Sequence, residues 1–244
     1  MCGRFTNQIT WRELVELYGI HDQPALNLRP RYNVAPSQDI PIVRPVQPDE
    51  EASEENGEEE SGGRPPREVV MARWGLVPFW AKDLKVGTKM INAKAETVDE
   101  KPAFRNAFKR RRCLIPADGF YEWKKLKGGP KSKGEKQPYR LCLPGQRPFA
   151  FAGLWEENDK LEVTSCTIIT CEPNKVAAEI HDRMPVLLPP EAYADWLSPD
   201  TAPEDAKALL KPYVGEMIAY PVDKAVGSPK NDGPELIEEM GEGS

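Results

Sequence analysis

The chain has 244 residues, with 33 Lys and Arg against 39 Asp and Glu, a net charge of −6 and five cysteines. This length suffices for one well-packed domain without disulfides or a structural metal, and neither an apolar run of membrane length nor a signal peptide is present, which argues against membrane and secreted disulfide-rich proteins. The odd cysteine count, without CxxC spacing and with only two histidines, predicts free thiols in a reducing, cytoplasmic compartment and neither a zinc site nor another cofactor.

The charge is unevenly distributed along the chain. Eight of the acidic residues lie between residues 48 and 63, where no basic residue occurs, so the remainder has 33 basic against 31 acidic residues. The stretch from about 47 to 66 lacks the apolar residues needed to offset the entropy cost of ordering, and we expect a mobile surface insertion between two strands. The alternative is an acidic mimic that competes for a basic groove. The body of the domain is mildly basic, which leaves a nucleic-acid partner open.

A short helix is predicted directly behind the amino terminus. Thr10 and Glu13 have the spacing of a capping box, apolar residues follow at helical intervals, and Gly19 ends the run. The next stretch, residues 24–36, is broken by prolines and predicts an ordered loop.

Strands dominate the rest of the chain. Residues 40–46 alternate as a strand, with Pro41 and Pro45 suggesting a sheet edge. Further strands are predicted at 68–77, 113–116, 119–124, 139–143, 149–155, 161–171 and 217–222. Short helices are predicted at 101–111, 173–180, 190–197 and 203–210. Because strands outnumber helices without regular alternation, we expect a single α+β domain with a curved, barrel-like, mixed or antiparallel sheet flanked by short helices.

The second residue carries the most distinctive chemistry. Removal of Met1 would leave Cys2 with a free α-amine and a thiol on the same carbon, both partly deprotonated near neutral pH. An aldehyde would form an imine with the amine and then a thiazolidine with the sulfur, whereas an amide would be attacked by the thiolate. The alternative is a small buried residue.

Three more polar residues stand in apolar or charged surroundings. Glu122 lies between two aromatics in a predicted strand, either on the solvent face or buried as an acid or base with a raised pKa. His181 has an ordinary pKa near neutrality, although a lone histidine is more often structural. Asn92 is a candidate for a functional role, and the alternative is that it simply caps a turn.

Aromatic and basic residues suggest contacts with nucleic acid. Phe79 and Trp80 are adjacent in a turn, and neighbouring side chains in extended backbone point in opposite directions, so one is expected to be exposed as a platform for bases. The helix at 101–111 carries a basic face that either follows phosphates or is simply solvated, and its residues are Arg105, Lys109, Arg110, Arg111 and the adjoining Arg112.

Several motifs occur in an order that resembles one known family. They are Met-Cys-Gly-Arg-Phe at the start, Arg-Tyr-Asn-Val-Ala-Pro at 31–36, Trp-Gly-Leu at 74–76, Ile-Asn-Ala at 91–93, Gly-Phe-Tyr-Glu-Trp at 119–123 and Ile-His-Asp-Arg-Met-Pro at 180–185. The chain resembles the SOS-response-associated peptidase (SRAP) family from Cys2 to about Glu238. The resemblance implies an SRAP-like domain over 1–238, containing the acidic insertion, and a flexible tail over 239–244.

The resemblance also implies a reaction. A protein of this family traps abasic sites in single-stranded DNA by a lyase-like attack that ends in a thiazolidine crosslink. Carried over, Cys2 supplies the amine and the thiol, and Asn92 orients the amine or the sugar. Glu122 shuttles protons during ring opening and imine formation, and His181 assists proton transfer and the reversal of the crosslink. We expect a monomer in the cytoplasm, associated with the nucleoid if the source is bacterial.

The DNA-binding residues implied by the resemblance are Arg4, Lys94 and Arg183 for phosphates and Phe79 and Trp80 for bases. One of them departs from the family's usual pattern, in which the asparagine is followed by Ala-Arg. Lysine keeps the charge at position 94 but lacks the bidentate fork of arginine, so a less oriented phosphate contact is expected there.

Two other function classes are compatible with these residues. A thiol peptidase or self-processing enzyme would use Cys2 as a nucleophile toward an amide, although only Met1 precedes Cys2 in this sequence. A noncatalytic single-strand-binding module would need the basic and aromatic residues but not the Cys2 thiol. Cysteine-dependent crosslinking to abasic DNA separates the three.

Overall fold

The computed structural model describes residues 2–21, 23–47, 66–126 and 134–241. The expected acidic insertion, apart from its two ends, and the last three residues of the expected tail lie outside the described residues. Among the helices that are described, none is long and apolar enough to cross a membrane.

Five strands close into a mixed barrel. Their order is β10-β4-β3-β6-β9, and pairing between β9 and β10 completes the circle. β10 runs parallel to β4 and to the short strand β5, and the other neighbours are antiparallel. The barrel strands are β3 (Asp39–Pro45), β4 (Arg67–Trp74), β6 (Arg112–Ala117), β9 (Phe149–Asn158) and β10 (Val163–Cys171). Three short strands extend this sheet: β5 (Asn92–Lys94), β11 (Met184–Pro185) and β12 (Leu187–Leu188).

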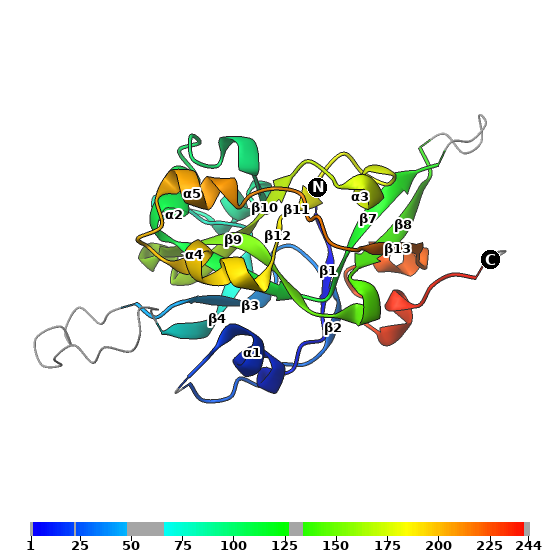
Figure 1. The fold of residues 1–244 in the computed structure, drawn as a ribbon, viewed down its shortest axis with the longest axis horizontal. Helices are drawn as coiled ribbons and strands as arrows, with labels where there is room; N and C mark the ends of the chain where they lie inside the picture. Colours follow the sequence, from blue (N-terminus) through cyan, green and yellow to red (C-terminus); the bar gives the residue numbers. More distant parts are fainter. Residues whose placement is uncertain (1, 22, 48–65, 127–133, 242–244) are drawn as a thin grey trace, which may run out of the picture.

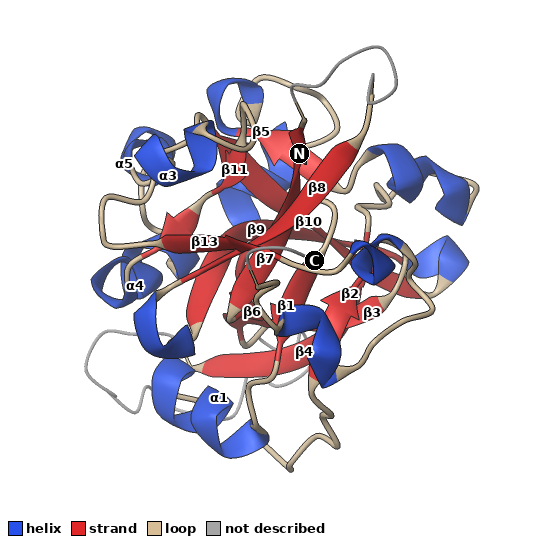
Figure 2. Cartoon of the chain, turned by 90° about the vertical axis from the view of Figure 1, so that its right-hand side faces the viewer, coloured by secondary structure: helices blue, strands red, loops and turns tan. Residues whose placement is uncertain are grey.

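A second, antiparallel sheet lies beside the barrel, on the right in Figure 1, and crosses the view in Figure 2. Its order is β13-β8-β7-β1-β2. Its strands are β1 (Phe5–Asn7), β2 (Arg31–Val34), β7 (Gly119–Lys125), β8 (Lys136–Cys142) and β13 (Ile218–Pro221). Asp118 alone separates β6 from β7, so the chain passes directly from the barrel into this sheet.

The helices are short and lie at the periphery. α1 begins after Thr10, and both bonds of the predicted capping box are present: Glu13 N donates to Thr10 Oγ1 at 3.3 Å and Thr10 N donates to Glu13 Oε2 at 2.7 Å. The α-helices are α1 (Trp11–Tyr18), α2 (Arg105–Arg110), α3 (Lys175–Ala178), α4 (Tyr193–Leu197) and α5 (Pro203–Ala208). Short 3₁₀ helices cover Leu84–Lys89, Ala95–Thr97, Pro144–Gln146, Asp159–Leu161, Pro190–Ala192, Lys224–Gly227 and Pro234–Ile237.

The expected fold class is confirmed, and two local expectations are wrong. The predicted loop at 24–36 contains β2, which is formed because β1 offers it an antiparallel partner distant in sequence. β3 is not an edge strand, since it lies between β4 and β6. It meets β6 at the single pair of Val43 with Leu114, so Pro41 and Pro45 remove few ladder hydrogen bonds on that side.

One continuous core joins the barrel to the second sheet. Phe5 of β1 is completely buried, and its ring packs edge-on against Trp74 and Phe151, with centroids 5.2 and 5.7 Å apart. Burying such a side chain contributes roughly 1.5–3 kcal/mol. The amino-terminal strand is therefore anchored three residues after Cys2.

Candidate active site

The amino-terminal strand places Cys2 inside the protein. Phe5 pairs with Phe120 of β7, and Tyr121 N donates to Arg4 O at 2.9 Å, so the register continues toward the start of the chain. The Cys2 side chain has no exposed surface, and its Sγ lies 3.9 Å from Arg4 O. Burial raises the pKa of this thiol, and the nearby charge of Glu122 raises it further. The thiol is therefore protonated at neutral pH in this arrangement.

Asn92 reaches Cys2 from the barrel. It begins β5, where it pairs with Ile168 of β10, and its Nδ2 donates to the Cys2 carbonyl at 2.8 Å. Its Oδ1 is buried and has no hydrogen-bond partner among the described residues. A buried acceptor without a donor is costly, so this atom is suited to receive a proton donor that binds or is created beside Cys2.

Glu122 is buried, with 4 % of its surface exposed, which excludes the solvent-face alternative. The strand alternation does point Glu122 away from Tyr121, but both faces of β7 are covered here. Tyr121 packs in a small cluster with Val222, Val226 and Leu236 from the carboxy-terminal part of the chain. Burial raises the pKa of Glu122.

His181 follows α3 and faces Glu122. The turn is held by the His181 N–H, which donates to Ala177 O at 2.8 Å, and the ring places Nε2 3.8 Å from Glu122 Oε2. Nδ1 accepts a hydrogen bond from Arg183 N at 3.0 Å and lies 2.9 Å from Asp182 Oδ1, so the ring is oriented with Nε2 on the side of Glu122.

The four residues thus combine a thiol, an amide, a carboxyl group with a raised pKa and an imidazole. They come from β1, β5, β7 and the turn after α3, and contacts or electrostatic interactions link each of them to another. Such a group can transfer protons to and from an atom bound at Cys2. The order of the motifs in the sequence suggested this set, and of the two alternatives that the sequence left open for Glu122 the buried one is observed.

Two of the expected phosphate ligands are engaged by the protein itself. Arg4 Nη1 donates to Asn33 Oδ1 at 2.9 Å and to Val226 O at 2.7 Å. Arg183 makes a bidentate pair with Glu96, with N–O distances of 2.6 and 3.0 Å. These partners were missed because they are far away in sequence. Lys94, in contrast, is exposed on β5, two residues after Asn92.

Both aromatic residues of the 79–80 turn are exposed, where one was expected. Phe79 and Trp80 expose 57 % and 52 % of their surface. The turn is rigid because buried Asn158 Nδ2 donates to Pro78 O and Ala81 O at 2.8 and 3.1 Å. Exposed aromatic rings on a fixed turn provide surfaces on which bases can stack.

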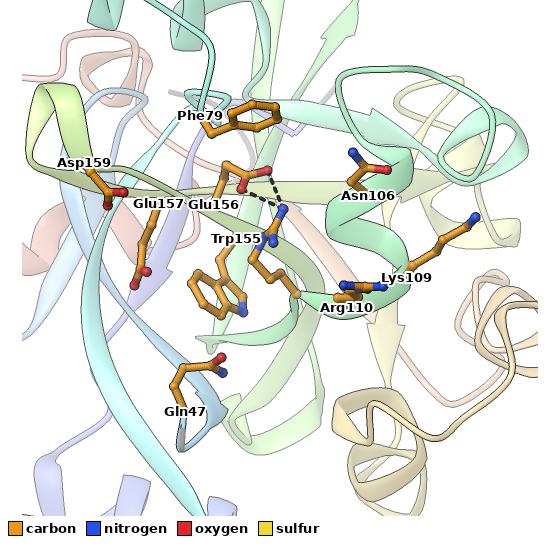
Figure 3. Close-up of a pocket in the computed structure, with 10 residues that line it drawn as sticks. Gln47, Phe79, Asn106, Lys109, Arg110, Trp155, Glu156, Glu157 and Asp159 are labelled. Atoms are coloured by element: carbon orange, nitrogen blue, oxygen red, sulfur yellow. Dashed lines mark hydrogen bonds and ion pairs between the residues drawn. The ribbon is translucent and has the colours of Figure 1, made fainter. Parts of the chain in front are cut away.

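Phe79 also lines a cavity of about 780 Å³ between β9 and α2 (Figure 3). Lys109 and Arg110 reach it from α2. The predicted basic face is divided, however, because Arg111 pairs with Glu156 at 2.7 Å and Arg112 is buried, with its guanidinium on backbone carbonyls. Of the predicted site residues, Phe79 is the one that borders this cavity, and Cys2, Asn92, Glu122 and His181 are not among its lining residues.

Comparison with protein families identifies the chain's relatives. The family model described as SOS response associated peptidase (SRAP) matches residues 1–229. The chain belongs to the SRAP family. Abasic site processing protein YoqW of Bacillus subtilis (strain 168) is 45 % identical over 245 residues, covering 98 % of this chain and 99 % of YoqW. Abasic site processing protein HMCES of Xenopus tropicalis is 32 % identical over 239 residues, covering 86 % of this chain and 66 % of HMCES.

Solved structures support the SRAP fold. A protein from Bacteroides thetaiotaomicron superposes with a TM-score of 0.77 at 24 % identity, covering 98 % of this chain and all of that one. A phage-related protein from Bordetella bronchiseptica has a TM-score of 0.65 at 29 % identity, covering 91 % of this chain and 95 % of that one. The barrel with its accompanying sheet is therefore shared across nearly the whole length.

Proposed function

We propose that this SRAP protein binds single-stranded DNA and traps abasic sites covalently through Cys2 after removal of Met1. The observation that carries the proposal is the convergence on Cys2 of an amide from β5 and an acid/base pair from β7 and the turn after α3. The relatives named abasic site processing proteins, which match over most of this chain, support the choice of an abasic site as the target.

The reaction balances without an oxidant or a cofactor. The α-amine of Cys2 attacks the aldehyde carbon of the ring-opened sugar, and a proton moves from nitrogen to oxygen. Loss of one water gives an imine. The thiol then adds across the C=N bond, sulfur to carbon and proton to nitrogen, which closes a thiazolidine. An aldehyde and an aminothiol thus give a ring and one water.

The neighbouring groups suit these proton transfers. Glu122, with its raised pKa, holds a proton that it donates to the departing hydroxyl, regains one from the nitrogen as the imine forms, and then relays the thiol proton to that nitrogen. His181 Nε2 lies 3.8 Å from Glu122 Oε2 and assists these transfers. The unpartnered Oδ1 of Asn92 accepts a hydrogen bond from the freed amine, while Nδ2 holds the Cys2 carbonyl.

The raised pKa of the Cys2 thiol favours a reaction in which the amine attacks first over one in which the thiol does, as in a peptidase. A thiol peptidase needs a thiolate as its first nucleophile, and cysteines that serve this purpose have lowered pKa values. Burial and Glu122 raise the pKa of Cys2 instead. In the proposed reaction the amine attacks first, and the thiol adds only to an imine that already lies next to it.

In this proposal the DNA strand has cationic and aromatic partners on the protein surface. Lys94 is exposed beside Asn92, and Phe79 and Trp80 offer exposed rings. Arg4 contacts phosphate through the N–H groups that remain, since Nη1 holds Asn33 Oδ1 and Val226 O and Nη2 holds Gly227 O. Arg183 reaches a phosphate only by giving up Glu96, so we assign it a smaller share of the affinity.

The test uses the purified full chain and a single-stranded oligonucleotide with one abasic site. Intact mass should first show that Met1 is absent. A denaturing gel should then show a heat-stable shifted band for wild type and for Cys171→Ala, a control for a second buried thiol, but none for Cys2→Ala. No band with wild type, or an equal band with Cys2→Ala, would refute the proposal. Cys2-dependent cleavage of a peptide panel would instead establish the peptidase, and binding without crosslinking would establish the noncatalytic module.

A further inference from the structure

We propose that Lys124, Lys125 and Lys136, here called the hairpin lysines, bind phosphates of the DNA strand on one side of the abasic site. This inference rests on the proposed function and assigns a second part of the DNA path. The hairpin lysines lie where β7 and β8 approach the end of their hairpin. They were not among the DNA-binding residues expected from the sequence, and they enlarge the proposed DNA-binding surface.

The hairpin lysines share a cavity with His181, one member of the acid/base pair. The cavity has a volume of about 820 Å³, and His181 and Asp182 line it together with all three lysines. Its other lining residues are Trp123, Leu126, Glu179 and Ile180. A strand whose sugar reaches Glu122 and His181 therefore has an open, partly basic depression directly beside it.

Two of the hairpin lysines repel each other in the folded protein. Lys125 is directly opposite Lys136 in the antiparallel pair, and like charges in this arrangement destabilise a sheet. Neither makes an ion pair with a described residue. The adjacent Glu135 is bound elsewhere, since Lys224 Nζ lies 2.6 Å from its Oε1. An anion that bridges the two ammonium groups would relieve this repulsion.

Lys124 extends the cluster toward the catalytic group. It lies on the same face of β7 as Glu122, two residues or roughly 7 Å further along the strand. Its Nζ is 5.6 Å from the centre of the Tyr139 ring, a cation–π contact that limits its rotamers. The half-buried Trp123 in the same cavity offers an aromatic surface to a base.

The acidic residues of the cavity do not cancel this charge. Glu179 and Asp182 face three lysines and His181, and Asp182 is directed at the imidazole at 2.9 Å. Three lysines against two carboxylates leave the excess positive. A polyanion with phosphates along a chain fits this surface, and the adjacent site identifies it as the DNA strand that carries the lesion.

The experiment measures equilibrium binding of oligonucleotides that contain tetrahydrofuran, an abasic analogue without an aldehyde. In one oligonucleotide the analogue lies at the 5′ end, and in the other at the 3′ end, so each presents a single flank. Lys125→Gln/Lys136→Gln is compared with Lys160→Gln/Lys211→Gln, a control pair of exposed lysines without ion pairs among the described residues. Affinity is measured by fluorescence anisotropy at several salt concentrations.

The hairpin variant should bind one of the two oligonucleotides more weakly, with a salt slope reduced by about 1.4, since each phosphate contact to a single strand contributes about 0.7. The other oligonucleotide and the control variant should match wild type. The thermal stability of the hairpin variant should equal or exceed that of wild type, because a repulsive pair is removed. An unchanged slope, or an equal loss with both oligonucleotides, overturns the inference. Wild type that binds neither oligonucleotide and does not crosslink abasic DNA overturns the proposed function itself.

Discussion

Asp118 and Glu122 are two carboxylates with equal burial, each 4 % exposed, only four residues apart, yet their surroundings differ. Asp118 Oδ1 lies 3.0 Å from Nη2 of fully buried Arg140, and the Gln8 N–H donates to its Oδ2 at 2.5 Å. Glu122 faces the Nε2 of His181 at 3.8 Å.

A guanidinium is always charged, whereas an imidazole and an α-amine are charged only when they bind a proton, and the amino terminus and His181 are the charges that oppose the effect of burial on the pKa of Glu122. The first carboxylate therefore has a permanent counter-charge and contributes to the structure. The counter-charges of the second can be gained and lost, which suits proton transfer. Burial alone does not distinguish the two roles; the permanence of the compensating charge does.

The largest expected effect concerns the fixed pair. Arg140→Met should lower the free energy of unfolding by about 3–5 kcal/mol, because it leaves the charge of Asp118 buried without its partner. Denaturant unfolding measures this loss. Crosslinking per folded molecule should stay unchanged at a temperature where the variant is folded. A variant as stable as wild type would contradict the structural role of this pair.

The switchable carboxylate should show the opposite pattern. Glu122→Gln should reduce the rate of crosslinking by about 10²-fold or more, the usual contribution of a general acid or base. Stability near neutral pH should not fall, since a neutral amide avoids the burial of a charge. Gels run under single-turnover conditions give the crosslinking rate, and denaturant unfolding gives the free energy of unfolding. A rate equal to that of wild type would remove Glu122 from the mechanism.

The pH dependence of stability sharpens the comparison further. Burial raises the pKa of Glu122 above its ordinary 4.5, so the folded state keeps a proton that the unfolded state has lost. Stability from this group is fully present below pH 4.5 and decreases as the pH rises through the folded pKa. Glu122→Gln should therefore gain stability relative to wild type across this window. A constant difference between the two proteins at all pH values would contradict the raised pKa.

The smallest expected effect is at Asn92. Asn92→Ala removes the hydrogen bond to the Cys2 carbonyl and should lower the free energy of unfolding by about 0.5–1.5 kcal/mol. The crosslinking rate should fall about tenfold, which corresponds to about 1.4 kcal/mol of lost orientation. Asn106→Ala, in an exposed helix position, serves as the control and should change neither quantity. Equal effects of the two substitutions would deny Asn92 a role at the site.

The sequence predicted features that depend on local chemistry or on motif order. The capping box of Thr10 and Glu13 predicted α1, and the α+β class followed from the number of strands. The motifs around Cys2, Asn92 and His181 indicated a common site, although each was separated from the others by tens of residues.

Features that depend on long-range pairing could not be predicted. Glu122 is buried because the amino-terminal strand with Cys2 and the turn with His181 approach its face of β7, and both are distant from it in sequence. Arg4 finds Val226 across 222 positions, and the barrel closes because β9 pairs with β10 while both also pair with other strands. The repulsive pair of Lys125 and Lys136 exists only once the register of β7 and β8 is known.

The central claim is that Cys2 supplies both an amine and a thiol to one aldehyde. The most direct measurement compares wild type with Cys2→Ser on abasic single-stranded DNA, with and without borohydride, on a denaturing gel. Wild type should give a heat-stable band without reductant, because the thiazolidine is closed, and Cys2→Ser should give one only when borohydride traps its imine. Equal bands without borohydride, or a wild-type band that also requires borohydride, would contradict ring closure by the Cys2 thiol.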